Sequence, residues 1–123
     1  TIARWTKAGD LSPFHSDALA EYREAFADRA HLAASCDDYR AGATIDRAHD
    51  DASRAAGDTI AAPTLVLWGA ASIASGGGSP LDVWRTWSPL AKGAGVDSGH
   101  FVCEEAPREV LTHLAPFLAD AAR

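Results

Sequence analysis

The chain has 123 residues, 47% of them hydrophobic, and carries a formal net charge of −6 at pH 7. That length suits one domain or part of one. The acidic balance leaves no basic patch for phosphates or anionic lipid, which argues against nucleic acids and membrane surfaces as partners. No apolar run approaches the roughly 20 residues of a membrane span, and no secretory signal pattern is present. We therefore expect a cytoplasmic protein.

The cysteines and the first residue add two further expectations. Cys36 and Cys103 lie far apart, with no C-x-x-C pair and no clustered histidines. We expect neither a zinc site nor a disulfide, and predict that both thiols are small buried side chains. The chain begins at Thr1 and contains no Met, which suggests a fragment or a processed chain.

The first half of the chain is expected to be helical. The predicted helices cover residues 2–7, 17–26, 30–35 and 39–56. Ser16 is the expected N-cap of the second helix, and Asp37 or Asp38 that of the fourth, because short side chains with oxygen acceptors bind first-turn amides. Gly57 is expected to end the fourth helix.

The apolar residues of these helices are few. The second predicted helix carries one apolar stripe, which must pack on something, and the fourth is rich in Ala and in charge. The stripe consists of Leu19, Tyr22 and Phe26. This composition is typical of a cover laid over another domain.

The pattern changes at Ile60 to alternating strands and helices. A continuous apolar run at 64–69, bounded by Pro63 and a glycine, is typical of a central parallel strand buried on both faces. The elements that follow are a helix at 80–88, a strand at 93–97 and a helix at 107–122, whose apolar stripe is Leu111, Leu114, Phe117 and Leu118. This order predicts a doubly wound α/β sheet. Two strands cannot form such a sheet alone, so the others are expected from outside the chain.

One histidine lies where this sheet should present chemistry. His100 follows the second predicted strand, on a turn at Ser98-Gly99. Its imidazole has an unperturbed pKa near neutrality, so it is suited to take and return a proton. A loop histidine without a catalytic role is the alternative that this position leaves open.

Several segments together resemble the haloacetate (fluoroacetate) dehalogenase family of α/β hydrolases, over nearly the whole chain. They are Trp5–Ser12, Tyr22–Asp28, Cys36–Ala43, Leu67–Ala70, Pro80–Arg85 and Ser98–Phe101 followed by Glu104–Pro107. The resemblance implies the C-terminal portion of an α/β-hydrolase fold. Residues 1–59 would be the end of a helical cap domain. Residues 60–123 would supply the last two strands and helices of the doubly wound parallel core sheet.

The resemblance also implies roles for single residues. His100 matches the family's general base, which activates the water that hydrolyses an aspartyl-ester intermediate. Tyr39 matches a tyrosine that donates a hydrogen bond to the departing halide. Trp5 and Ile73 match residues of the substrate pocket. No metal or organic cofactor is implied.

Other residues of the family's site have no counterpart in this chain. The Asp nucleophile, the arginines that grip the substrate carboxylate and the orienting Asp would precede Thr1. The expected partners are therefore a haloacid substrate and a missing N-terminal part of the same protein, with a homodimer left open. Two alternatives to the dehalogenase remain: an epoxide hydrolase, and a non-catalytic relative or truncated chain.

Overall fold

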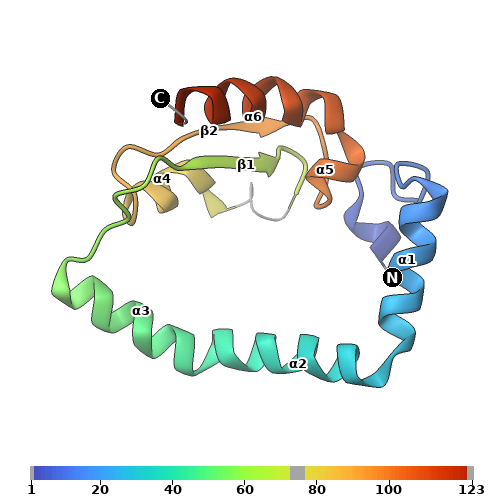
Figure 1. The fold of residues 1–123 in the computed structure, drawn as a ribbon, viewed down its shortest axis with the longest axis horizontal. Coiled ribbons are helices and arrows are strands. Elements are labelled where there is room, and N and C mark those ends of the chain that lie inside the picture. Colours follow the sequence, from blue (N-terminus) through green and yellow to red (C-terminus); the bar gives the residue numbers. More distant parts are fainter. Residues whose placement is uncertain (1, 73–76, 122–123) are drawn as a thin grey trace. The chain divides into compact units, whose positions relative to one another are not determined.

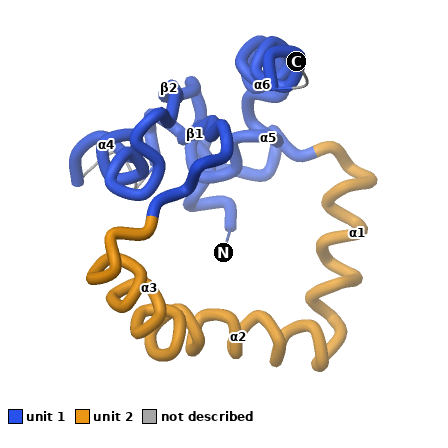
Figure 2. The backbone as a smooth tube through the Cα atoms, turned by 60° about the vertical axis from the view of Figure 1, so that its left-hand side comes forward, with its two compact units in different colours: residues 1–14, 59–123 blue, residues 15–58 orange. Residues whose placement is uncertain are grey.

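The computed structural model describes residues 2–72 and 77–121 of the chain. It divides into two compact units: unit 1 is residues 1–14 with residues 59–123, and unit 2 is residues 15–58 (Figure 2). The sequence placed residues 1–14 with the helical segment, whereas the structure groups them with the strands. The interpretation of the two parts as cap and core stays a prediction.

Unit 1 is built on two parallel strands. Its elements are η1 (Ile2–Trp5), β1 (Leu65–Gly69), α4 (Pro80–Arg85), β2 (Lys92–Val96), α5 (Val102–Glu105) and α6 (Pro107–Ala121). The register pairs Leu65 with Lys92 and Gly69 with Val96. Helix α4 connects the strands on one face of the sheet, and α6 lies along the other (Figure 1). The predicted doubly wound order is therefore present in the chain.

The core of unit 1 is small. The buried apolar side chains are Phe14, Val66, Ala91, Val96 and Val110. The prediction that the first strand is buried on both faces is wrong for this structure, since Leu65, Leu67 and Trp68 are only half-buried. The physical reason is that the described residues form a sheet of two strands. On each face of the sheet, the side chains of β1 therefore have those of a neighbouring strand on one side only.

Helix α6 buries only part of the predicted stripe. Leu111 and Leu118 are 59% and 55% exposed, whereas Leu114 and Phe117 are half-buried and lie on the side of the buried Val110. Positions 110 and 117 are two helical turns apart, as are 111 and 118, so the two pairs lie along neighbouring stripes. The stripe that contains Val110 faces the sheet.

Unit 2 consists of three consecutive helices, α1 (Ser16–Ala27), α2 (Arg29–Ala43) and α3 (Ile45–Ala56). Helix α2 contacts both α1 and α3. None of the three has a buried residue. In the predicted stripe, Tyr22 is 42% and Phe26 62% exposed. The helices of unit 2 therefore form without an apolar core of their own.

The helix boundaries in unit 2 differ from the predicted ones. The N-cap of α1 is His15, whose Nδ1 accepts a hydrogen bond from the Asp17 amide at 3.3 Å, rather than Ser16. Helix α2 runs through the break predicted near Asp37. Its N-cap is Asp28, whose side chain accepts a hydrogen bond from the Ala30 amide at 2.7 Å. The chain breaks instead at Thr44, with φ −131° and ψ −90°.

Two further findings concern the whole of the described chain. Cys36 and Cys103 are both exposed, so the prediction of buried thiols is wrong. Both lie on helices that have no buried residue. Within the described residues, none of the helices combines the length and the apolar character that crossing a membrane requires.

Candidate active site

The candidate site is the turn that follows β2 and presents His100. Ser98 and Gly99 are buried, whereas His100 is exposed. The loop after β1 passes next to this turn: the Ala70 amide donates to the Val96 carbonyl oxygen at 2.8 Å, and the Ala71 amide to that of Ser98 at 3.0 Å. The strand order therefore places the imidazole at the carboxyl ends of both parallel strands, where α/β sheets bind ligands.

Two glycines allow this close approach. A Cβ atom on Gly69 would lie 1.7 Å from the Gly99 carbonyl oxygen. A Cβ atom on Gly99 would lie 2.5 Å from both the Trp5 carbonyl oxygen and the Lys7 amide nitrogen. Any larger residue at either position would push the backbone segments apart. The turn is thus packed between the end of β1 and residues 5–7.

Aromatic rings flank the imidazole of His100. The Trp5 ring centroid lies 4.9 Å from that of His100 with an interplanar angle of 80°, and the Phe101 centroid lies 5.1 Å away at 89°. Both contacts are edge-to-face, an arrangement that aromatic pairs prefer. The His100 backbone amide also donates to the Trp5 carbonyl oxygen at 2.7 Å. The structure therefore brings together two of the four predicted site residues, Trp5 and His100.

The ring nitrogens of His100 are accessible, and this determines what chemistry the turn can perform. Among the residues that the structure describes, neither ring nitrogen of His100 has a hydrogen-bond partner. The loop after β1 meets the turn through backbone amides of Ala70 and Ala71 rather than through a carboxylate. An exposed imidazole held in this way can exchange a proton with a bound water or substrate.

Glu105, at the end of α5, joins the turn to the segment that contains Lys7. Its Oε2 accepts hydrogen bonds from the amides of Lys7 at 2.7 Å and Gly99 at 2.9 Å. Its Oε1 accepts a hydrogen bond from the Phe101 amide at 3.0 Å. From the sequence, Glu105 is only part of the segment Glu104–Pro107 that resembles the dehalogenase family, and no site role is predicted for it. The signal lay in its spacing, since Glu105 is one helical turn after Phe101, on a short helix that was not predicted.

The carboxyl group of Glu105 is held in its ionised form. Partial burial acts to raise its pKa, but the amides of Lys7, Gly99 and Phe101 and the nearby charge of His100 more than offset this, so the pKa is lowered from 4.5. Hydrogen bonds to a carboxylate favour the charged state in this way. At neutral pH, Glu105 therefore carries a full negative charge at the base of the turn.

An exposed ion pair lies beside the same segments. Lys7 pairs through Nζ with Asp97, whose own amide donates to Glu109 Oε2 at 3.1 Å. The side chains of Lys7 and Asp97 are 48% and 76% exposed. Pairs this exposed contribute little to stability. The buried backbone contacts of the turn therefore matter more to its geometry than this pair does.

The other two predicted site residues are not part of this cluster. Tyr39 lies on α2 in unit 2 and is 80% exposed. Ile73 lies outside the described residues. The roles predicted for all four residues, His100, Tyr39, Trp5 and Ile73, stay predictions.

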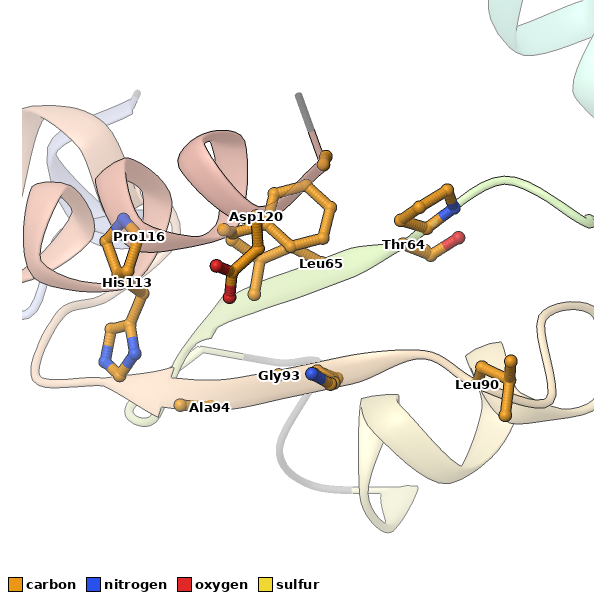
Figure 3. A pocket seen from close by; sticks show the side chains of 12 residues that line it. Thr64, Leu65, Leu90, Gly93, Ala94, His113, Pro116 and Asp120 are labelled. Carbon is orange, nitrogen blue, oxygen red and sulfur yellow. The ribbon is translucent and has the colours of Figure 1, made fainter. Parts of the chain in front are cut away.

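A cavity of about 490 Å³ lies elsewhere in unit 1, between the sheet and α6 (Figure 3). Leu65 and Gly93 line it from the strands, and His113, Phe117 and Asp120 line it from α6. His100 and Trp5 are not among its lining residues. Over the described part of the chain, no group of three metal-ligating side chains is suitably placed for an ion. The turn at His100 therefore remains the candidate site.

Comparison with known proteins supports this assignment of the fold. No protein-family model matches the chain. Over 111 residues it is 33% identical to a fluoroacetate dehalogenase from a Burkholderia species, a match that covers 88% of the chain and 35% of that protein.

Two solved structures resemble the chain closely. The crystal structure of a protein assigned as an α/β hydrolase, from Nostoc sp. PCC 7120, is 40% identical with a TM-score of 0.87, covering 95% of the chain and 39% of that protein. A structure assigned as an epoxide hydrolase, from Pseudomonas aeruginosa, is 40% identical with a TM-score of 0.82, covering 90% of the chain and 37% of that protein.

The chain thus spans little more than a third of the length of these proteins. The similarity to a fluoroacetate dehalogenase, expected from the sequence motifs, is confirmed, as is the predicted fold class. Three features indicate the same fold class: the parallel strands, the helices on both faces of the sheet and the sequence identity. The chain therefore has the architecture of a portion of the α/β-hydrolase fold.

Proposed function

We propose that the protein containing this chain hydrolyses short 2-haloacids such as haloacetate through an aspartyl-ester intermediate, with His100 as the base. One observation carries the proposal: an exposed imidazole on a buried turn, at the carboxyl end of a parallel strand, in a chain 33% identical to a fluoroacetate dehalogenase. A cytoplasmic location remains part of this proposal.

The first proposed step displaces the halide. An Asp carboxylate from outside these 123 residues attacks the carbon that bears the halogen, the carbon–halogen bond breaks, and the halide leaves with its electron pair. The Tyr39 hydroxyl would donate a hydrogen bond to the departing halide, whose negative charge develops in this step. Trp5, beside His100, and Ile73 would form the wall of the substrate pocket.

The second proposed step hydrolyses the ester. The His100 imidazole takes a proton from water as the water oxygen attacks the ester carbonyl carbon. When the ester bond breaks, the imidazolium returns the proton to the departing alkoxide of the 2-hydroxy acid. The regenerated Asp carboxyl group then loses its proton to solvent. His100 acts in this second step only, so its removal should separate the two steps.

Substitution of His100 tests the proposal in the full-length protein. With haloacetate, His100→Ala should release about one halide per protein and then stop, while intact-protein mass spectrometry detects the covalent ester. Steady-state turnover should fall by at least about 100-fold, since general-base catalysis contributes that much. His49→Ala, on the exposed surface of α3, is the matched control and should turn over normally. Steady turnover by His100→Ala with no accumulated ester would contradict the assigned role.

An epoxide hydrolase is the second candidate. The 40% identity to a structure assigned as an epoxide hydrolase favours it. That reaction needs tyrosine hydroxyls that donate to the epoxide oxygen, and Tyr22 and Tyr39 are the tyrosines of this chain. Assaying styrene oxide beside haloacetate separates the two, because diol formation without halide release would favour the epoxide hydrolase. Turnover of neither substrate, with no ester in His100→Ala, would favour a non-catalytic relative.

A further inference from the structure

We propose that Glu105 is a positioning residue for His100. Its carboxylate fixes the turn at residues 98–101 against residues 5–7, so that the imidazole of His100 and the indole of Trp5 keep one relative placement. This inference deepens the proposed function and rests on it for the catalytic consequence. The geometric part of the inference can be tested independently of activity.

The hydrogen bonds of the turn carry the argument. The amides on either side of His100, those of Gly99 and Phe101, both donate to the Glu105 carboxylate. The amide of His100 itself donates to the Trp5 carbonyl oxygen. Three consecutive amides of the turn are thus held, two of them by one side chain. The backbone that carries the imidazole has little freedom to rotate while these bonds persist.

The same carboxylate holds the segment that carries Trp5. The Lys7 amide donates to Glu105 Oε2, the oxygen that also accepts the Gly99 amide. The hydrogen bond from the His100 amide to the Trp5 carbonyl oxygen is a second link between residues 5–7 and the turn. Gly99 lies in the contact, with no room for a Cβ atom. Moving Glu105 should therefore change the separation of the Trp5 and His100 rings, which is now 4.9 Å.

Only an ionised carboxylate fits this role fully. It is an acceptor at both oxygens, and its bonds to backbone amides are strengthened by its charge. A glutamine at this position would place an NH2 donor opposite at least one amide donor, losing one or more bonds. An aspartate would keep the charge but shorten the side chain by one methylene, so that it could not reach all three amides. Both substitutions should loosen the turn without removing the imidazole.

The catalytic arm of the test uses haloacetate and the full-length protein. In Glu105→Gln, hydrolysis of the ester should slow by about 10- to 100-fold, the effect expected of a base misplaced by roughly 1 Å. Formation of the ester should change much less, so the ester should accumulate, as in His100→Ala, and be detected by intact-protein mass spectrometry. A role confined to global folding would lower both steps equally. Glu21→Gln, which removes the same charge from an exposed position on α1, should leave both steps unchanged.

The geometric arm measures amide hydrogen exchange and needs no activity. In Glu105→Gln the amides of Gly99 and Phe101 should exchange at least about 10-fold faster, whereas those of β1 and β2 should keep their protection. Glu105→Asp should show the same pattern, and it replaces Glu105→Gln if that variant fails to fold. Unchanged exchange at Gly99 and Phe101 in the folded variant, or equal slowing of both chemical steps, would overturn the proposal. If the wild-type protein releases no halide, the proposed function fails, while the exchange result still decides the role of Glu105.

Discussion

The carboxylate of Glu105 accepts hydrogen bonds from three backbone amides of two separate segments, residues 5–7 and the turn at residues 98–101. Hydrogen bonds from backbone amides to a charged acceptor are stronger than those to a neutral one. In this turn, such hydrogen bonds provide an acceptor for amides that lie close to buried backbone. A buried donor left without an acceptor lowers the free energy of unfolding by about 1–3 kcal/mol. Protonation of this single group should therefore weaken the whole turn.

Acid should release this contribution to stability. The pKa of Glu105 is lowered from 4.5 because its bonds with the amides of Lys7, Gly99 and Phe101, with the charge of His100, outweigh the effect of burial. A group whose pKa is lower in the folded state stabilises the fold above its unfolded pKa and loses that contribution as pH falls through the folded value. Urea unfolding of the full-length wild type and Glu105→Gln should thus differ by a constant amount from about pH 7 to 5. The difference should shrink below about pH 4.5.

Acid also protonates ordinary Asp and Glu side chains in this range, so the difference in unfolding free energy between the two proteins is the informative quantity. Glu21→Gln serves as the control and should differ little from the wild type at any pH. A gap between wild type and Glu105→Gln that stays constant down to about pH 3 would contradict the prediction.

At the scale of elements, α3 ends through a glycine with a left-handed backbone. Gly57 has φ +76° and its amide donates to the Arg54 carbonyl oxygen at 3.2 Å. The Asp58 amide donates to the Ser53 carbonyl oxygen at 3.0 Å, five residues back, as in a Schellman motif. The backbone direction at the end of α3 therefore depends on a conformation that other residues disfavour.

Two glycine substitutions in unit 2 should have opposite effects. Gly57→Ala should lower the free energy of unfolding by about 1 kcal/mol, because a Cβ atom is strained at positive φ. Gly42→Ala adds the same methyl group in α2, where nothing lies within 4 Å of the new atom. It should raise stability by up to about 1 kcal/mol through helix propensity. Chemical denaturation of the full-length protein measures both, and equal effects of the two substitutions would contradict this account.

The elements of unit 1 were predicted more accurately than those of unit 2. β1 and β2 lie within one residue of their predicted positions, and α6 begins at Pro107 as predicted. Apolar runs bounded by Pro and Gly mark such elements locally. In unit 2 the Ala-rich sequence permits helix almost throughout, so the breaks depend on which of several caps is used. Asp28 was not chosen as a cap from the sequence, and Thr44 gave no signal of a break.

At the scale of the molecule, much apolar surface remains exposed. Phe26, Val83, Leu90, Leu111 and Leu118 are each more than half exposed. Scattered exposed apolar residues are ordinary, but β1 also has an unpaired edge among the described strands. The chain spans 35% of the fluoroacetate dehalogenase that it matches. These features agree with the proposal that the other catalytic residues belong to a part of the protein outside these 123 residues.

The 123-residue chain alone is therefore expected to be inactive. The proposed mechanism draws its nucleophile and its carboxylate-binding arginines from outside these residues, and a base without a nucleophile cannot displace halide. An ion-selective electrode should detect no fluoride or chloride release from haloacetate by the purified chain. The full-length protein, prepared in the same way, is the positive control. Release above background by the chain would place a nucleophile within it and contradict the mechanism.

The sequence by itself determined the strand–helix order of unit 1, the turn that carries His100 and the resemblance to α/β hydrolases. These depend on local signals: apolar runs, Pro and Gly boundaries and short motifs. Only the tertiary structure decided that Trp5 lies beside His100 and that Glu105 joins residues 5–7 to the turn. The hydrogen bond from Lys7 to Glu105 connects residues 98 positions apart. No local pattern encodes such a contact, because it exists only once the chain has folded back on itself.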